Sequence, residues 1–160
     1  MKNLIKLSAL PLLGLALLSG DVFASAATVS GTHCKILAGT TYAYDNTGIK
    51  NTGSGANTIV VSCPIPMDST SLGSPVSFRM RVLDNTINGG FSCVPYVYSQ
   101  SGSTLSSGAT KTTTNAQTGA VTLGGSDWTA TVTGNVNTNI YTIQCTMPGN
   151  NSIIYTQRVQ

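Results

Sequence analysis

The chain has 160 residues, enough for one domain with its own hydrophobic core. Only 8% of the residues are charged, and all five acidic residues are Asp. Because the strong helix former Glu is absent and Lys and Arg are few, this composition argues against long solvent-exposed helices and favours strands and turns.

The first 26 residues have the three parts of a secretory signal peptide. Lys2 and Lys6 supply positive charge, a mostly apolar stretch follows, and small residues offer cleavage after Ala24 or after Ala26. We place the cleavage after Ala26, so that residues 27–160 form a single domain. The apolar stretch is short for a membrane span, and no later stretch is long enough to cross a bilayer. The sequence therefore predicts an exported protein, periplasmic or extracellular, with no membrane span after cleavage.

Up to residue 90, the rest of the chain divides into strand-length runs that end at turn residues. The clearest run ends at Leu83, because its apolar residues alternate with Ser77, Arg79 and Arg81, which is the period of a strand with one buried face. The expected strands in this half are 28–37, 42–44, 58–63 and 75–83, and the Gly-, Ser- and Asn-rich stretch 50–57 is expected to be a loop.

The second half of the chain continues in the same way. Residues 91–98 are an expected strand in which Pro95 indicates a sheet edge or a bulge, because proline has no amide hydrogen to donate. The expected elements after it are a polar loop at 99–108, a hairpin formed by 110–114 and 120–123, and strands at 127–133, 140–147 and 152–159.

The whole pattern is that of an all-β protein. Eight or nine short strands, with turn residues between them and no convincing helix, favour an antiparallel β-sandwich, with a barrel as the less favoured alternative. No linker divides residues 27–160, so we expect one sandwich domain.

Four cysteines follow the expected cleavage site. An even number in a small exported domain predicts two disulfides, whereas their wide spacing does not match the close ligand pairs of a zinc site. Residues 57–66 and 139–148 resemble one another, since each is a strand-like run that ends in a cysteine with a proline close behind. Four cysteines allow three pairings. The simplest is sequential, joining Cys34 to Cys63 and Cys93 to Cys145.

The positive charges after residue 26 are spread along the chain. Only Arg79 and Arg81 lie close together in sequence. A nucleic-acid-binding surface needs clustered cations that displace counterions from phosphates. The sequence therefore argues against a nucleic acid as partner.

No residue pattern predicts a catalytic, metal or cofactor site. The single histidine, His33, directly precedes Cys34, whose disulfide would hold its backbone, and the G-x-S-x-G motif of serine hydrolases is absent. Asp45 and Asp84 precede turn residues, where Asp side chains commonly bind the backbone. We therefore expect no catalytic residues, no metal and no cofactor.

Asp127 and Trp128 are the residues we expect first in a ligand-binding role. A carboxylate beside an aromatic ring can hydrogen-bond to a sugar while the ring stacks on it. The alternative is that Trp128 packs in the core with Ala130 and Val132, which share its face of the strand. The tyrosines have the same two alternatives, and on strands they are more often packing residues than a ligand surface.

The stretches IVVSCP (59–64), YTIQC (141–145) and SIIY (152–155) together resemble a group of small bacterial exported proteins of unknown function. The resemblance spans most of residues 27–160. It implies secretion from a bacterium and a disulfide-linked β fold, and it implies no activity and no site residues.

Three functional hypotheses follow from the sequence. The leading one is a non-catalytic secreted or periplasmic module that binds a glycan or another surface protein, or that forms part of the cell surface. The first alternative is a subunit of an extracellular assembly, such as a pilin-like protein, because residues 152–159 alternate as a donor or acceptor strand does. The second alternative is a secreted hydrolase that uses His33 and Asp127.

Overall fold

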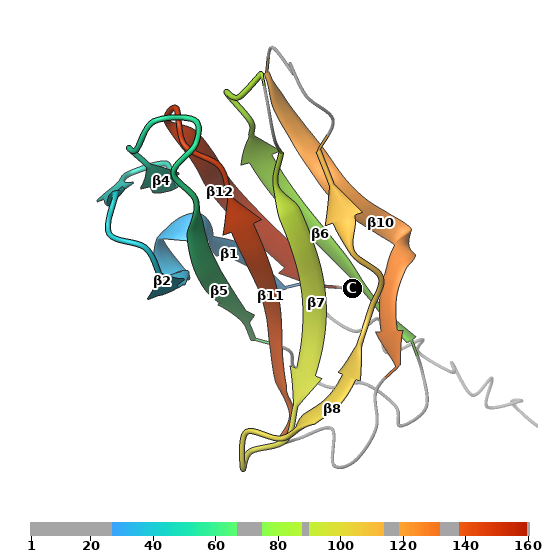
Figure 1. Cartoon of the computed structure of the whole chain (residues 1–160). Coiled ribbons are helices and arrows are strands. Elements are labelled where there is room, and N and C mark those ends of the chain that lie inside the picture. The colour runs from blue at the N-terminus through green and yellow to red at the C-terminus, as the bar shows by residue number, and fades with distance from the viewer. Residues whose placement is uncertain (1–26, 67–74, 88–89, 114–118, 132–137, 160) are drawn as a thin grey trace, which may run out of the picture.

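A computed structural model of the chain describes residues 27–66, 75–87, 90–113, 119–131 and 138–159. The expected signal peptide, residues 1–26, lies outside these ranges. Two antiparallel sheets face one another and enclose a single core (Figure 1). The β-sandwich expected from the sequence is therefore confirmed. Among the described residues, no helix is long and apolar enough to cross a bilayer.

The first sheet, sheet A, has six strands. Its central strand is β12, which pairs with β6 on one side and with β4 and β1 in succession on the other. In spatial order the sheet contains β10 (Ala120–Thr131), β6 (Pro75–Leu83), β12 (Ser152–Val159), β4 (Gly48–Asn51) and β3 (Tyr42–Asp45), with β1 (Ala27–Ser30) beside β12.

The second sheet, sheet B, also has six strands. Its central strand is β11, which pairs with β5 and β7. In spatial order the sheet contains β2 (Lys35–Ala38), β5 (Ile59–Ile65), β11 (Ile140–Met147), β7 (Ser92–Tyr98) and β8 (Thr104–Ser107), with β9 (Lys111–Thr112) also on β7.

The described residues form twelve strands, more than the eight or nine expected. One reason is that the expected strand 28–37 is divided by a 3-10 turn at Gly31–His33, which carries the chain from sheet A to sheet B. A Cβ on Gly31 would lie 2.0 Å from the carbonyl oxygen of Ile154, so only glycine permits this close crossing. Strands β4 and β8 also occupy parts of the expected loops at 50–57 and 99–108.

The prediction that residues 110–114 and 120–123 form a hairpin is wrong. Strand β9 pairs with β7 in sheet B, whereas β10 pairs with β6 in sheet A. These two strands follow one another in the sequence but belong to opposite sheets. Alternation within a run predicts that a strand forms but does not say which strand it pairs with.

The expectation that Pro95 lies at a sheet edge also needs a correction, because its strand, β7, has partners on both sides. In an antiparallel strand the nitrogen and the carbonyl of one residue point to the same side. The carbonyl of Pro95 accepts a hydrogen bond from the amide of Gly108 at 3.0 Å, so the proline nitrogen faces the gap between β9 and β8. The missing N–H therefore costs no hydrogen bond to β11.

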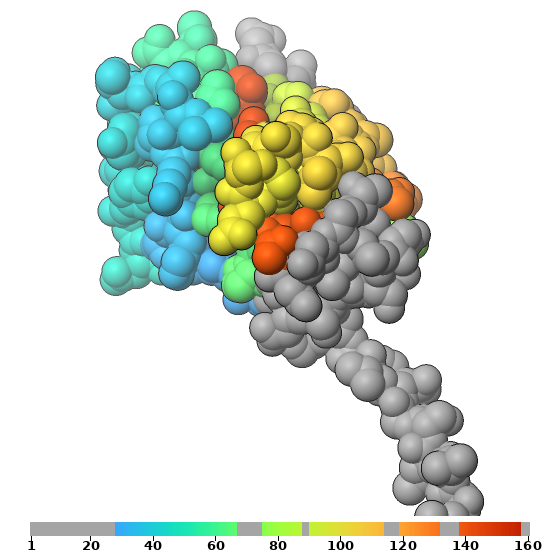
Figure 2. Space-filling view, turned by 90° about the horizontal axis from the view of Figure 1, so that it is seen from below, coloured from blue at the N-terminus to red at the C-terminus, as the bar shows by residue number. Residues whose placement is uncertain are grey.

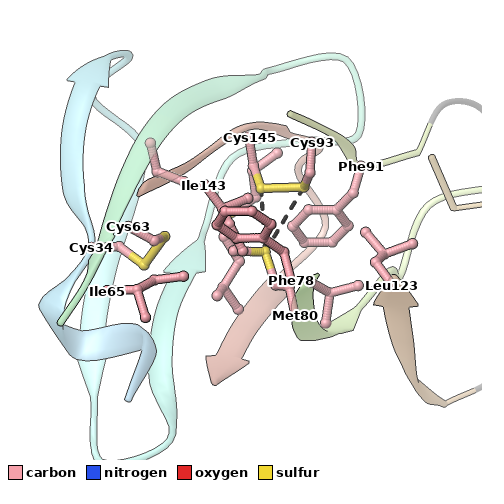
Figure 3. Packing of buried hydrophobic residues seen from close by; sticks show 14 of the residues in the cluster. Cys34, Cys63, Ile65, Phe78, Met80, Phe91, Cys93, Leu123, Ile143 and Cys145 are labelled. Atoms are coloured by element: carbon pink, nitrogen blue, oxygen red, sulfur yellow. Dashed lines mark hydrogen bonds between the residues drawn. A yellow bond between two sulfur atoms is a disulfide. The ribbon is translucent and has the colours of Figure 1, made fainter. Parts of the chain in front are cut away.

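Both disulfides lie within sheet B and join neighbouring chain segments. Cys34 is bonded to Cys63, and Cys93 to Cys145, which is the sequential pairing. Cys93 and Cys145 are directly opposite in the β7–β11 register, with Cα atoms 4.1 Å apart. Their sulfurs face the core and contact the sulfur of Met80 in β6 at 3.8 and 3.3 Å (Figure 3). This contact connects the two sheets at the centre of the core.

The first four strands lie together at one side of the sandwich, as the blue-to-teal atoms show in the view from below (Figure 2). Sheet A ends there in β3 and sheet B in β2. The hydroxyl of Tyr44 in β3 donates a 2.7 Å hydrogen bond to the carbonyl of Cys34, next to β2. This bond ties the two sheet edges together.

Candidate functional site

The outer face of sheet A carries the exposed arginines. In β6, burial alternates as the sequence predicts, so that Phe78 and Met80 enter the core while Arg79 and Arg81 face outward. Because neighbouring strands lie about 4.8 Å apart, the register decides what surrounds each arginine. The sheet is closely packed beneath them, which makes this face a rigid base for polar side chains.

Hydroxyl side chains flank Arg81 on both sides. The register places Thr122 of β10 and Thr156 of β12 beside Arg81, and Ser30 of β1 beside Thr156. In the backbone register, Arg79 is paired with residue Arg158 of β12. Three of the six lysines and arginines after residue 26 thus occupy adjoining positions, although they are scattered in the sequence.

A β-bulge shapes one end of this face. The register between β12 and β6 shifts after Ile154, so that Tyr155 is an extra residue next to Thr156. Two glycines pack against the bulge, because a Cβ on Gly31 or on Gly48 would lie 2.0 or 1.8 Å from the Ile154 carbonyl oxygen. The turn between β3 and β4 therefore comes close to the bulge and forms a wall there.

Two shallow hollows lie side by side on this face and share Arg81 and Thr156. We call them together the arginine groove. The first has a volume of about 260 Å³ and the second of about 540 Å³. The first is lined by Thr28, Arg79, Met80, Arg81, Thr122 and Thr156, and the second by Ser30, Asn46, Thr47, Arg81, Ala120, Tyr155 and Thr156.

No acidic residue of the described chain lines either hollow. Asp45 is the last residue of β3, directly before the turn that lines the second hollow. Its carboxylate accepts hydrogen bonds from the Thr47 hydroxyl and the Thr47 amide, and the first of these is the main reason that its pKa is lowered. Asp84 is buried and bound to Thr86 and Thr113. Within the described residues, Arg79 and Arg81 therefore have no carboxylate partner.

Trp128 is not on the surface, so the expected stacking role for it is wrong. Its side chain is fully buried in the core and packs edge-on against Phe78, with ring centroids 6.3 Å apart. Its Nε1 donates a 2.6 Å hydrogen bond to the carbonyl of Ala109. A ring with no exposed face cannot stack on a sugar. The core alternative is the one that the structure supports.

Asp127 is exposed, as neighbours along a strand point to opposite faces. Its carboxylate pairs with the ammonium of Lys111, and this hydrogen bond is the main reason that its pKa is lowered. The pair is solvent-exposed, with 69% of the Asp127 side chain accessible. Exposed ion pairs contribute little to stability. The structure gives Asp127 no link to the arginine groove.

We expect the Asp127→Asn variant to unfold at nearly the same urea concentration as the parent at neutral pH. A carboxylate whose pKa is lowered in the folded state contributes its full stabilisation above its unfolded pKa, near 3.9, and loses this contribution as the pH falls from there through the folded pKa. The small difference should therefore disappear as the pH falls through the lowered pKa. Urea titrations at pH 7 and at successively lower pH values check this, and a large loss of stability at pH 7 would contradict it.

His33 is exposed and lies at a different place, in a hollow of about 500 Å³ between β1 and the ends of β5 and β11. Its Nδ1 is 3.5 Å from the Thr32 hydroxyl. The other residues around the hollow are mainly apolar, and no acidic residue is among them: Val29, Pro64, Ile65, Pro66, Asn139, Ile140 and Tyr141. Asp127 does not line this hollow, so the structure does not bring together the pair named for a hydrolase.

Sequence reasoning noticed that Arg79 and Arg81 are close together but missed the site. The detectable signal was their place on the polar side of the most regular strand. The contributions of Thr122 and Thr156 had no such signal, because they depend on the pairing of β6 with β10 and β12.

Comparison with known proteins adds little to this description. No protein-family model matches the chain, and no curated protein matches it. Among solved structures, the β-(1,4)-mannanase GH26-CBM35 of Podospora anserina matches with a TM-score of 0.44 and 10% sequence identity. The match covers 84% of this chain but only 27% of the mannanase.

Proposed function

We propose that the protein is a non-catalytic binding module that acts outside the cytoplasm and binds an acidic glycan in the arginine groove. The observation that carries this proposal is the pair of exposed arginines, Arg79 and Arg81, on a rigid sheet face without a carboxylate partner among the described residues. Exposed cations that a protein leaves unpaired and surrounds with hydroxyl groups are suited to an external anion.

Arginine favours a particular kind of ligand. Its planar guanidinium can donate two parallel hydrogen bonds to a carboxylate or a sulfate, which a lysine ammonium cannot do. Thr122 and Thr156, which flank Arg81, can donate or accept further hydrogen bonds. A polymer that carries both acidic groups and hydroxyls, as acidic glycans do, matches both parts of the groove.

The disulfides support a location outside the cytoplasm, because such bonds persist in oxidising compartments. A nucleic acid is the competing polyanion, but single strands are bound largely by stacking of the bases on aromatic rings. Among the described residues that line the groove, one is aromatic, Tyr155. The composition of the groove therefore favours a glycan.

We expect the Arg81→Gln variant to bind an acidic polysaccharide at least about tenfold more weakly than the parent, since a hydrogen bond to a charged group contributes about 1.5–3 kcal/mol. Affinity electrophoresis in gels containing polygalacturonate or dextran sulfate measures this change. The matched control is Lys35→Gln, which removes the same charge from β2 of the opposite sheet and should leave binding unchanged.

Three outcomes would overturn the proposal. The first is that neither polysaccharide retards the parent protein at low salt. The second is that Arg81→Gln and Lys35→Gln weaken binding equally, since that would be a general effect of net charge. The third is that uncharged dextran or a DNA oligonucleotide binds as well as the acidic polysaccharides.

A separate observation bears on the pilin-like alternative. Strand β12, which was expected to serve as a donor or acceptor strand, is central in sheet A and has partners on both sides. Its Gln157 is buried and its Ile154 is part of the core. A strand held in this way cannot be donated to a neighbouring subunit without unfolding sheet A.

A further inference from the structure

We infer that the arginine groove binds several consecutive sugars of an acidic polysaccharide, with the acidic group at Arg79 and Arg81 and the neutral part of the chain extending along β12 to the β3–β4 turn. This inference rests on the proposed function and specifies its ligand. Its first support is the arrangement of the two hollows, which share Arg81 and Thr156 and so continue into one another.

The groove is long in the direction of the strands. Side chains on one face of a strand repeat every ~6.6 Å, so the row of Arg79, the row of Arg81 and the row of Ala120 together span about 13 Å. The bulge at Tyr155 and the β3–β4 turn extend the second hollow beyond the last row. A single carboxylate or sulfate would occupy only the part between the two arginines.

The two ends of the groove differ in chemistry. Both arginines line the first hollow, whereas the far part of the second is lined by neutral polar residues: Ser30, Asn46, Thr47 and Tyr155. A small anion needs only the cationic end. A polymer whose acidic group occupies that end would place the hydroxyls of its next sugars against the neutral end.

Polar groups along the groove are free to bind a ligand. Within the described part of the chain, the side chains of Asn46, Tyr155 and Thr156 form no hydrogen bond with other residues, and neither arginine has a carboxylate partner. Thr47 differs, because its hydroxyl is bound to Asp45, so it can act only as an acceptor for the ligand. A ligand would therefore find unused donors at both ends.

The test is a series of oligosaccharides of one to six sugars that carry a single uronic acid at one end and neutral sugars beyond it, titrated calorimetrically against the full chain. Oligosaccharides of matched length with a single sulfate in place of the uronic acid form a second arm. We expect the affinity to rise at least about fivefold from the dimer to the hexamer, as further hydrogen bonds form. Whichever series binds more tightly shows whether the arginines select carboxylate or sulfate.

Two variants separate the ends of the groove. Arg79→Gln should weaken the binding of every oligomer by a similar factor. The double variant Asn46→Ala/Tyr155→Phe keeps the aromatic ring but removes the amide and the hydroxyl, and it should weaken only the longer oligomers. Lys35→Gln is again the control, and thermal unfolding of each variant establishes that it is folded.

The failure of this inference differs from the failure of the proposed function. An affinity that is already complete with the monomer or the dimer would overturn the extended groove but leave a single-anion site in place. A double variant that binds short and long oligomers equally well as the parent would also overturn it. The absence of binding for all acidic oligomers and polymers would overturn both proposals.

Discussion

Replacing Cys93 and Cys145 together by alanine is expected to lower the free energy of unfolding by about 4 kcal/mol, the chain-entropy contribution of a disulfide that closes a loop of this size. The two residues are 52 positions apart in the chain, and their disulfide is fully buried against Met80. Most of this loss comes from the unfolded chain, which becomes free to expand. Urea titration of the oxidised parent and of the variant measures the difference.

Chemical reduction is the control for this prediction. A reductant should shift the urea midpoint of the parent more than that of the double alanine variant, because the variant has only the Cys34–Cys63 disulfide left to lose. Equal midpoints for the oxidised parent and the variant would contradict the prediction. Such a result would mean that the buried bond adds nothing beyond the packing of sheet B.

The second large effect is expected at Trp128, where substitution by alanine should cost about 3–5 kcal/mol of stability. The ring is completely buried, packs against Phe78 and donates a hydrogen bond to the Ala109 carbonyl. Gly124 leaves space for it, since a Cβ there would lie 2.2 Å from the ring. Removing the ring leaves a cavity in the core and also removes the hydrogen bond to the Ala109 carbonyl.

The Trp128→Phe variant is the matched comparison. It retains an aromatic ring but loses the hydrogen bond to Ala109, so its loss of stability should be smaller than that of Trp128→Ala. Both variants should still bind acidic polysaccharide under conditions in which they are folded. If Trp128→Ala kept its stability and lost glycan binding, the sequence-based ligand role of Trp128 would be restored and the core role rejected.

Particular elements explain how much of the fold could be predicted. Strands β6, β11 and β12 have the same bounds in the sequence prediction and in the structure, because each is a regular run between turn residues. The pairing of Cys93 with Cys145 was the simplest of the three that the sequence allowed, and the resemblance between two strand-and-turn segments favoured it. Those segments contain β5 and β11, which are neighbours in sheet B, so the resemblance has a structural counterpart.

The candidate site was less predictable for a physical reason. Thr122 and Thr156 come from two strands that are far from Arg81 in the sequence, and only the register of sheet A brings them beside β6. For Trp128, the sequence allowed two roles and could not choose between them. Its alternation with Ala130 indicated a side chain that faces the core, but an aromatic ring on a strand is also suited to a ligand-binding surface.

The sequence by itself determined that this is an all-β chain, which residues face inward along its best strands, and that four cysteines are available for two disulfides. These properties depend on local periods and turn residues, which can be read within a few positions. Only the tertiary structure decided that β9 and β10 belong to opposite sheets and that Arg79 and Arg81 lie in a groove. Such properties depend on which strands pair with one another. Because strands pair through backbone hydrogen bonds that every residue type can form, the side chains within one strand do not identify its partner.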